Sequence, residues 1–308
     1  RVEQAVEAIR NRADMEDVEM VYYLYVTNSH GRLMGVVSLR QLLLAHPSKL
    51  LRDVMNTRII RTLVSDSQET VAKLVDKYRL LAIPVVDDEG ILLGMITVDD
   101  VIDVIEDETT REMLAMAGTS SSELLTQSPL SIFKLRVPWL FAAFMGGVGA
   151  AFVLDEFEAT LAEIIQLSAF LPIVMGMAGN VGTQAATVAV RGLATGSLKL
   201  ANFRSLLIKE ISVGLLLGSF YGILLSLVSF LMFHNEVSFI PKLMLTVGVA
   251  MLMNICLAAI IASSLPMLFQ RLGTDPALAS GPFVLTSIDV LGVINYLIVA
   301  SVICHSLG

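Results

Sequence analysis

The sequence predicts a multidomain membrane protein, in which an α/β soluble module is followed by an all-α domain of five transmembrane helices. Of its 308 residues, 55% are hydrophobic and only 16% are charged, and the mean hydropathy is +0.73. Soluble domains are roughly 45–50% apolar and about 25% charged. Most charged residues precede residue 136, and long apolar windows follow it. The chain therefore divides into a soluble N-terminal part and a membrane C-terminal part.

The soluble part contains an internal repeat. Residues 24–46, "LYVTNSHGRLMGVVSLRQLLLAH", align without gaps with residues 83–105, "IPVVDDEGILLGMITVDDVIDVI". Each copy is typical of a strand, a glycine turn, a second strand and a helix. An amphipathic segment, "VEQAVEAIRNRA" or "QETVAKLVDKYRL", precedes each copy and predicts a further helix. A unit this small buries its apolar face by pairing with its twin.

This repeat resembles a tandem pair of cystathionine-β-synthase (CBS) domains, with a truncated first motif over 1–50 and a second over 51–107. The resemblance implies that "GMITVDD" binds ATP or another adenine nucleotide through Thr97 and Asp100. A carboxylate can accept hydrogen bonds from both ribose hydroxyls, while a hydroxyl can donate one to a phosphate oxygen. Gln41 holds the acidic position in the first copy, which implies at most one strong site. Alternatively, Thr97 caps the following helix and the adjacent aspartates favour its dipole.

An acidic segment joins the soluble and membrane parts. Asp99, Asp103, Glu106 and Asp107 recur three or four residues apart, and like charges at that spacing repel on a helix. A solvated helix face is the usual explanation. However, the segment leads toward the membrane part, where Asp275 precedes the last span, and cations could bridge two such acidic surfaces. We therefore expect an acidic connecting helix over 108–135 and a metal-dependent switch.

Apolar windows place the transmembrane domain over 136–308. The stretch "GMAGNVGTQ" predicts a break in the second span, and Pro172 and Pro282 predict further breaks. Basic residues precede the first span and surround the loop after the second, whereas acidic residues follow the first. By the positive-inside rule, the N-terminus and the CBS pair are cytoplasmic and the C-terminus is external, and we expect a bacterial inner membrane. The five spans are expected at about 136–154, 161–190, 206–233, 240–268 and 281–305.

Asp289 is the one acidic residue deep inside these apolar windows. A carboxylate at that depth must be protonated, exposed to water in a cavity, or opposite a cation. We expect it to mark an aqueous pathway. The deep amides Asn254 and Asn295 could equally be hydrogen-bonding contacts between helices. Further candidates for lining the pathway are Asn180, Gly182 and Gln184.

Sequence patterns of the intramembrane proteases are absent. A zinc protease needs a HExxH helix, and none of the four histidines begins that motif. An aspartyl protease needs two catalytic carboxylates, and only Asp289 lies deep within the spans. We therefore expect no enzyme activity, and we expect no nucleic-acid partner.

The CBS pair, the acidic segment and the membrane motifs "GNVGTQ" and "TDPALASGPFVLTSIDVLG" together resemble the MgtE family of magnesium channels. The family has an additional N-terminal helical domain ahead of the CBS pair, which we expect this chain to lack. The resemblance implies a homodimer in which Asp289, helped by the Leu285 carbonyl, holds a largely hydrated Mg²⁺. It also implies that cytosolic Mg²⁺ favours the closed state, although Arg111 stands where an acid is expected. The implied sensing carboxylates are Asp99, Asp100, Asp103, Glu106, Glu108, Glu112 and Asp275.

The chemistry of Mg²⁺ agrees with this resemblance. Mg²⁺ sheds water slowly, so a fast pathway should hold the ion through its waters with few carboxylates. One aspartate per chain, doubled by a two-fold axis, meets that requirement. The alternative is a proton- or ion-coupled carrier for Mg²⁺, Mn²⁺ or Co²⁺, in which Asp289 alternates between protonated and cation-bound states.

Overall fold

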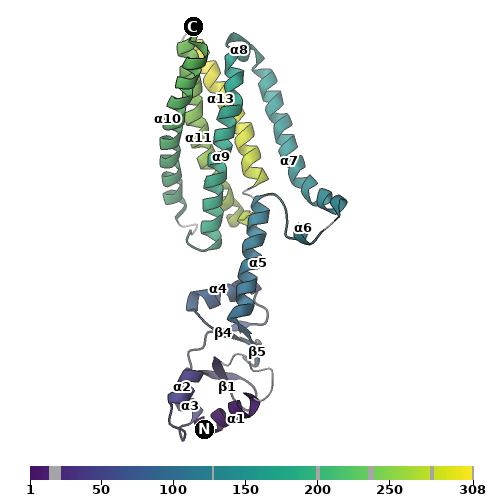
Figure 1. Ribbon diagram of the computed structural model, residues 1–308, viewed down its shortest axis with the longest axis vertical. Helices are drawn as coiled ribbons and strands as arrows, with labels where there is room; N and C mark the ends of the chain where they lie inside the picture. Colours follow the sequence, from purple (N-terminus) through teal and green to yellow (C-terminus); the bar gives the residue numbers. More distant parts are fainter. Residues whose placement is uncertain (14–21, 127, 199–201, 235–238, 278–280, 307–308) are drawn as a thin grey trace. The chain divides into compact units, whose positions relative to one another are not determined.

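The computed structural model describes residues 1–308 except 14–21, 127, 199–201, 235–238, 278–280 and 307–308. The chain forms two compact units, Arg1–Thr109 and Thr110–Gly308 (Figure 1). The first unit contains the helices and strands of the repeat. The second contains the long apolar helices.

The first copy of the repeat is a β-hairpin flanked by helices. Strands β1 and β2 are antiparallel, with an irregularity between Val26 and Thr27. Helix α2 begins with a capping box, because the Ser38 hydroxyl accepts from the Gln41 backbone while the Gln41 side chain accepts from the Ser38 backbone. Its elements are α1 (Val2–Ala13), β1 (Tyr23–Thr27), β2 (Leu33–Ser38), α2 (Leu39–Leu44) and α3 (Leu51–Val54).

The second copy has the same plan, with a short extra strand. Strand β4 pairs with β5 antiparallel and with β3 parallel. Its irregularity falls between Val85 and Val86, which align with Val26 and Thr27 of the first copy. Its elements are β3 (Thr62–Leu63), α4 (Gln68–Tyr78), β4 (Ala82–Val86), β5 (Leu92–Thr97) and α5 (Val98–Met116). The predicted repeat of strand, glycine turn, strand and helix is confirmed.

The two glycine turns join the copies symmetrically. The Leu33 amide donates to the Gly90 carbonyl, and the aligned Leu92 amide donates to the Gly31 carbonyl, both over 3.0 Å. Gly31 and Gly90 have positive φ angles of 77° and 83°, a conformation that glycine adopts without steric cost. Each copy therefore completes the backbone bonding of its twin, as expected for a small repeat that is stable only in pairs.

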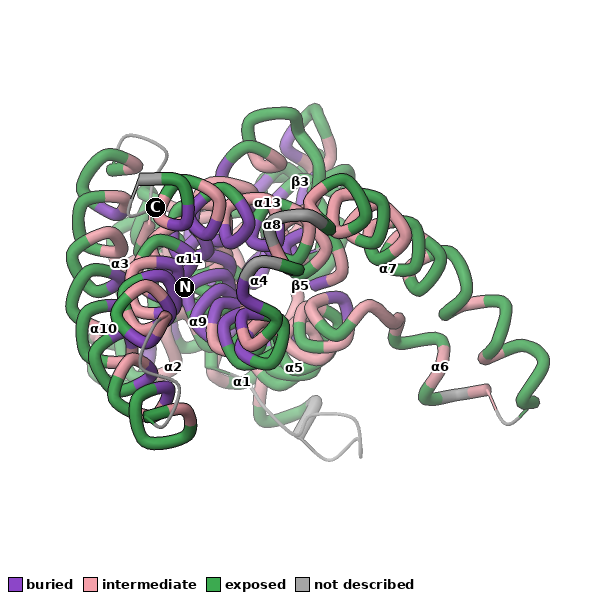
Figure 2. The backbone as a smooth tube through the Cα atoms, turned by 90° about the horizontal axis from the view of Figure 1, so that it is seen from above, coloured by how far each residue is buried: buried purple, intermediate pink, exposed green. Residues whose placement is uncertain are grey.

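Among the residues that the structure describes, the second unit has five helices that are long and apolar enough to cross a membrane. Of these, α11 packs against α9, α10 and α13. Figure 2 shows the buried backbone concentrated in α9, α11 and α13, whereas α7 and much of α10 are exposed. The five are α7 (Pro129–Glu156), α9 (Gln166–Ala194), α10 (Phe203–Phe233), α11 (Ile240–Arg271) and α13 (Pro282–Ser306), and the short helices are α6 (Ser122–Leu125) and α8 (Glu158–Glu163).

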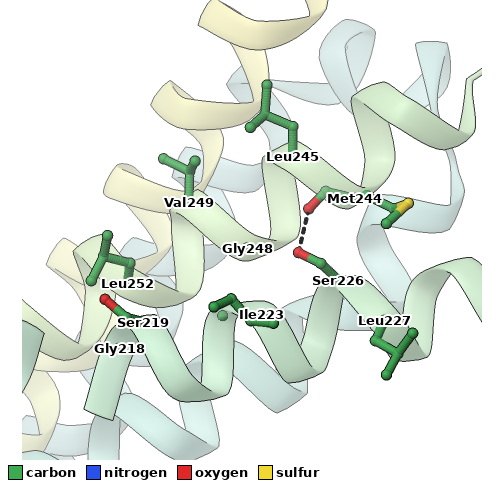
Figure 3. A pocket seen from close by; sticks show the side chains of 11 residues that line it. Gly218, Ser219, Ile223, Ser226, Leu227, Met244, Leu245, Gly248, Val249 and Leu252 are labelled. Atoms are coloured by element: carbon green, nitrogen blue, oxygen red, sulfur yellow. Dashed lines mark hydrogen bonds between the residues drawn. The ribbon is translucent and has the colours of Figure 1, made fainter. Parts of the chain in front are cut away.

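Helices α10 and α11 cross at glycines. A Cβ atom on Gly222 would lie 2.6 Å from the Gly248 carbonyl oxygen, so only glycine fits there. Beside this crossing, the Ser226 hydroxyl donates to the Met244 carbonyl over 2.7 Å, as Figure 3 shows. The groove in Figure 3 has an almost wholly apolar lining.

Helix α7 lies along α13 with none of its described residues buried. The Trp139 and Phe283 rings meet edge to face, with 6.0 Å between centroids. Farther along, Gly146 leaves room for the Thr286 side chain. The first and last spans of the chain are therefore neighbours.

Two predictions about helix boundaries are wrong. No break occurs at "GMAGNVGTQ" or Pro172, because α9 is helical throughout Gln166–Ala194, and Pro282 begins α13. The glycines of this stretch allow α9 to pack closely against α13. The connecting segment over 108–135 is not one helix: α5 ends at Met116, Gly118 follows with φ of 76°, and α6 and the first turns of α7 complete the segment.

Candidate functional site

Asp289 lies in the middle of α13, on a face that the chain's own core leaves uncovered. Val284 and Ile288 on the opposite side are 0% and 1% exposed. Leu285, one turn before Asp289, is 40% exposed, and Asp289 is also classed as exposed. An acidic residue on such a face of a membrane helix requires water, a cation or another chain. The lone deep carboxylate thus faces outward from the single chain.

A polar stripe on α9 accompanies this face. Asn180, Thr183, Gln184 and Thr187 recur at helical spacing and are all exposed. The Thr183 hydroxyl is bonded back to the Gly179 carbonyl over 2.9 Å. In the described contacts, the side-chain amides of Asn180 and Gln184 make no such hydrogen bond to their own helix.

Glycines bring α9 and α13 together. Gly182 is buried, and a Cβ atom there would collide with the Ile288 side chain. A Cβ atom on Gly179 would lie 3.8 Å from the Leu285 side chain. Gly182 thus allows α9 and α13 to pack closely, whereas Asn180 and Gln184 lie on the polar stripe. Because Leu285 shares its face with Asp289, the Gly179 contact places the stripe beside the Asp289 face.

The deep amides Asn254 and Asn295 differ in their bonding. Asn254 is 1% exposed, and its amide donates to the Ala250 carbonyl of its own helix over 2.9 Å. Its Oδ1 atom has no partner among the described residues and faces Gly292 of α13. The Asn295 Nδ2 atom is likewise buried without a described partner. Neither amide makes the predicted hydrogen bond between helices in the described contacts.

The last turns of α5, from Thr110 to Met116, are part of the second unit. Ala115 lies in a buried cluster with Val190 and Ala277. Gly281 fits directly against the Met116 carbonyl, where a Cβ atom would collide. These contacts are apolar and close, so the last turn of α5 belongs to the membrane domain.

Two ion pairs surround this contact. Arg191 Nη1 lies 3.2 Å from Glu112 Oε2, and Arg111 Nη2 lies 4.0 Å from Asp275 Oδ2. The Glu112 side chain is only 15% exposed, whereas the other three are 38–55% exposed. Asp275 also accepts from the Ala277 amide over 2.9 Å. Sequence reasoning missed Arg191 because the two residues of its pair are 79 positions apart.

The other predicted sensing carboxylates lie farther toward the start of α5. Asp99, Asp100, Asp103 and Glu106 are exposed, and Glu108 is half-buried. Within the described residues, no three acidic, histidine or cysteine side chains of one chain come close enough to hold a metal. The single chain therefore does not assemble a dehydrating metal cage from these residues.

The predicted nucleotide motif forms a helix start. The Thr97 hydroxyl donates to Asp100 Oδ2 over 2.7 Å, and the Thr97 amide is 3.3 Å from the same oxygen. In the first copy, Ser38 and Gln41 make the equivalent contacts. Replacing the carboxylate by an amide at this position thus preserves the local fold.

A cleft of about 240 Å³ lies at the first copy of the motif. Ser38, Gln41 and Arg58 line it together with Tyr25. Burial, with a contribution from Tyr23, raises the pKa of Tyr25 to about 12, so its hydroxyl is protonated at neutral pH. That hydroxyl is buried and has no partner among the described residues. The cleft thus offers a cation, hydroxyl groups and side-chain amides to a polar ligand.

Comparison with known proteins gives matches to both units. A family model described as "Divalent cation transporter", MgtE, matches residues 171–299, and one described as "CBS domain" matches residues 51–107. The chain is 39% identical over 300 residues to the magnesium transporter MgtE of Enterococcus faecalis, covering 97% of this chain and 64% of that protein. It is 36% identical over 307 residues to the magnesium transporter MgtE of Thermus thermophilus, covering 99% and 66%.

Similar solved structures cover about a third of this chain. One is described as the cytosolic domain of the Mg²⁺ channel MgtE in complex with ATP, with 43% identity, 33% of this chain and 41% of that chain covered, and a TM-score of 0.32. The chain spans just under two thirds of the length of the curated relatives it matches.

Proposed function

Because this chain belongs to the MgtE family of divalent cation transporters, we propose that it carries Mg²⁺ across a membrane along a pathway at Asp289. The observation that carries the proposal is the position of this carboxylate. It lies in the middle of a spanning helix, on a face that the chain's own core leaves exposed. An exposed acid at that depth is explained by an aqueous ion pathway.

The scarcity of ligands favours a hydrated ion. Mg²⁺ keeps several waters and binds proteins through one or two carboxylates. Asp289 supplies one charge per chain, and the Leu285 carbonyl, one turn earlier, can accept a hydrogen bond from a bound water. Selection then depends on the size and charge of the hydrated ion.

A homodimer completes this pathway in our proposal. The polar stripe of α9 and the Asp289 face of α13 are uncovered in one chain. A two-fold axis beside them would bring two Asp289 carboxylates toward one ion, and the ion would offset their mutual repulsion. Asn180 and Gln184 would border the same pathway.

We place the first unit and the start of the chain in the cytoplasm, and the C-terminus outside, in a bacterial inner membrane. The basic residues at the ends of α9 and α10 support this orientation through the positive-inside rule. Transport, rather than enzyme catalysis, is the activity that the membrane carboxylate supports.

Cytosolic Mg²⁺ regulates the pathway through α5 in our proposal. The predicted carboxylates of α5 are Asp99, Asp100, Asp103, Glu106, Glu108 and Glu112, and Asp275 lies beside Arg111. Because one chain gathers no three-ligand site among them, we propose that hydrated Mg²⁺ screens this acidic helix rather than entering a cage. The closed state must bind Mg²⁺ more tightly than the open state for the ion to shift the equilibrium.

An adenine nucleotide such as ATP binds the CBS pair in our proposal. Thr97 and Asp100 carry the motif that predicts it, and the cleft at Arg58 and Tyr25 offers a second position. The Arg58→Gln and Asp100→Ala variants would distinguish these two binding positions.

Magnesium flux into liposomes tests the transport proposal. We expect Asp289→Asn to abolish flux in dimeric protein of normal stability, because the variant keeps the side-chain shape and loses the charge. Asp155→Asn is the matched control, since Asp155 is an exposed acid near the end of α7. Flux equal to the wild type in the Asp289 variant would exclude this residue from the pathway.

A coupled carrier is the alternative, because carriers also use lone intramembrane carboxylates. Flux driven by membrane potential alone, unchanged by an imposed proton gradient, is expected for a channel. Dependence on the proton gradient, with Mn²⁺ and Co²⁺ as competing substrates, indicates a carrier.

A further inference from the structure

A polar cavity of about 780 Å³ lies where α9 ends and α10 begins. It is lined by the basic residues Arg191 and Lys209 and by the neutral polar side chains of Thr187, Thr195, Ser197, Asn202 and Ser205. None of the described residues that line it is acidic. Through Thr187 the cavity adjoins one end of the polar stripe of α9, but its basic residues lie outside that stripe.

The hydrogen-bonding groups of the cavity suit a phosphate. Arg191 uses Nη1 to bind Glu112, but a guanidinium has five N–H donors, so one anion does not exhaust it. Lys209 is exposed and lies one helical turn beyond Ser205. Charged donors and hydroxyls together form short, strong hydrogen bonds with phosphate oxygens.

The walls of the cavity also suit a lipid. Val188 lines it and is 51% exposed, and Ile208, which follows the cavity on α10 beside Lys209 without lining it, is 57% exposed. Both belong to spanning helices, so these apolar side chains border the acyl region while Arg191 and Lys209 mark the level of the headgroups. A soluble anion would use the charges and leave the apolar wall unused.

We propose that this cavity binds the phosphate headgroup of an anionic phospholipid. Lys209 and the remaining donors of Arg191 hold the phosphate, and the neutral polar groups bind the ester and glycerol oxygens. The negative surface potential of a leaflet rich in anionic lipid adds to the attraction. The proposal requires that the five helices lie in a bilayer, and it does not depend on which ion they transport.

Native mass spectrometry of the detergent-purified full chain, with phosphatidylglycerol added, tests this proposal. We expect wild-type protein to retain phosphatidylglycerol under conditions that remove phosphatidylcholine. Lys209→Gln should weaken retention about tenfold, since a charge-assisted contact is lost. Lys209→Arg should restore it. The matched control is Arg204→Gln, which removes the same charge from the same helix outside the cavity.

Competition separates the two sources of phosphate. Glycerol phosphate, which has the headgroup chemistry without acyl chains, should displace the lipid only poorly. Efficient displacement by glycerol phosphate would identify a soluble-anion site and overturn the lipid assignment. Equal retention by the Lys209→Gln and Arg204→Gln variants would show that phosphatidylglycerol binds by general charge, and would exclude the cavity.

Discussion

Glu112 on α5 and Arg191 on α9 form an ion pair, with 3.2 Å between Oε2 and Nη1. Glu112 is largely buried at this contact, beside the apolar cluster of Ala115 and Val190. Glu112 is shielded from water here while Arg191 is half exposed, so loss of the arginine would leave a largely buried charge uncompensated, whereas loss of the glutamate would leave a charge that water partly solvates. This pair therefore controls how firmly the end of α5 is held on the membrane domain.

Glu112→Gln tests this control. We expect faster hydrogen exchange in residues 110–117, with about 1–2 kcal/mol less protection, because Arg191 loses its charged partner. Arg191 is 55% exposed, so water offsets part of the loss. Glu106→Gln, an exposed position on the same helix, should leave exchange unchanged. Equal protection in the Glu112 variant and the wild type would mean that apolar packing alone holds this turn.

Changing Asp103, Glu108 and Glu112 together to Asn or Gln tests regulation by Mg²⁺. In the wild type, protection of residues 99–117 should rise with millimolar Mg²⁺, because the ion offsets repulsion along α5. In the variant, protection should not depend on Mg²⁺. Ca²⁺ and raised NaCl serve as controls for simple ionic screening. The same Mg²⁺ response in both proteins would place the sensor elsewhere.

Arg58→Gln and Asp100→Ala distinguish the two nucleotide hypotheses. Calorimetry of the full chain with ATP should show about tenfold weaker binding for Arg58→Gln if the cleft at the first copy holds the phosphates. The Thr97→Ala and Asp100→Ala variants should be the weaker binders if the second copy is used. Arg61→Gln, an exposed charge outside the described cleft lining, is the control. Unchanged affinity in every variant would exclude both positions.

Gly222→Ala tests the crossing of α10 and α11. A methyl group there meets the Gly248 carbonyl oxygen at 2.6 Å, so the helices must separate. We expect a loss of about 1–3 kcal/mol in the free energy of unfolding. Gly147→Ala is the control, because no atom lies within 4 Å of a Cβ atom at that position. A similar melting temperature for both variants would show that the crossing adjusts without cost.

The repeat could be predicted from sequence because its signals are local. Gly31 and Gly90 occupy matching turns between two strands, and this spacing determines both the hairpin and its pairing. The break in α9 was predicted wrongly because glycine in a membrane segment has two uses. Gly182 gives room to Ile288 without interrupting the helix, and only the neighbouring helix distinguishes these uses.

The candidate sites could be predicted only in part. Asp289 is visible in sequence because a charge within an apolar run is unusual. The Glu112–Arg191 pair is not visible, because both residues are ordinary surface types and their contact depends on how α5 meets α9. The cleft at Arg58 is not visible in the sequence for a related reason. Its walls come from both copies of the repeat, so neither copy contains it alone.

The pairing of α7 with α13 has a consequence for biosynthesis. Of the five long apolar helices described, α7 is the first to leave the ribosome, yet it packs along α13, the last of the five. Until α13 has entered the bilayer, α7 must remain there with lipid in place of its Trp139–Phe283 and Gly146–Thr286 contacts. A nascent chain that stops before residue 282 would thus leave α7 without the helix against which it packs.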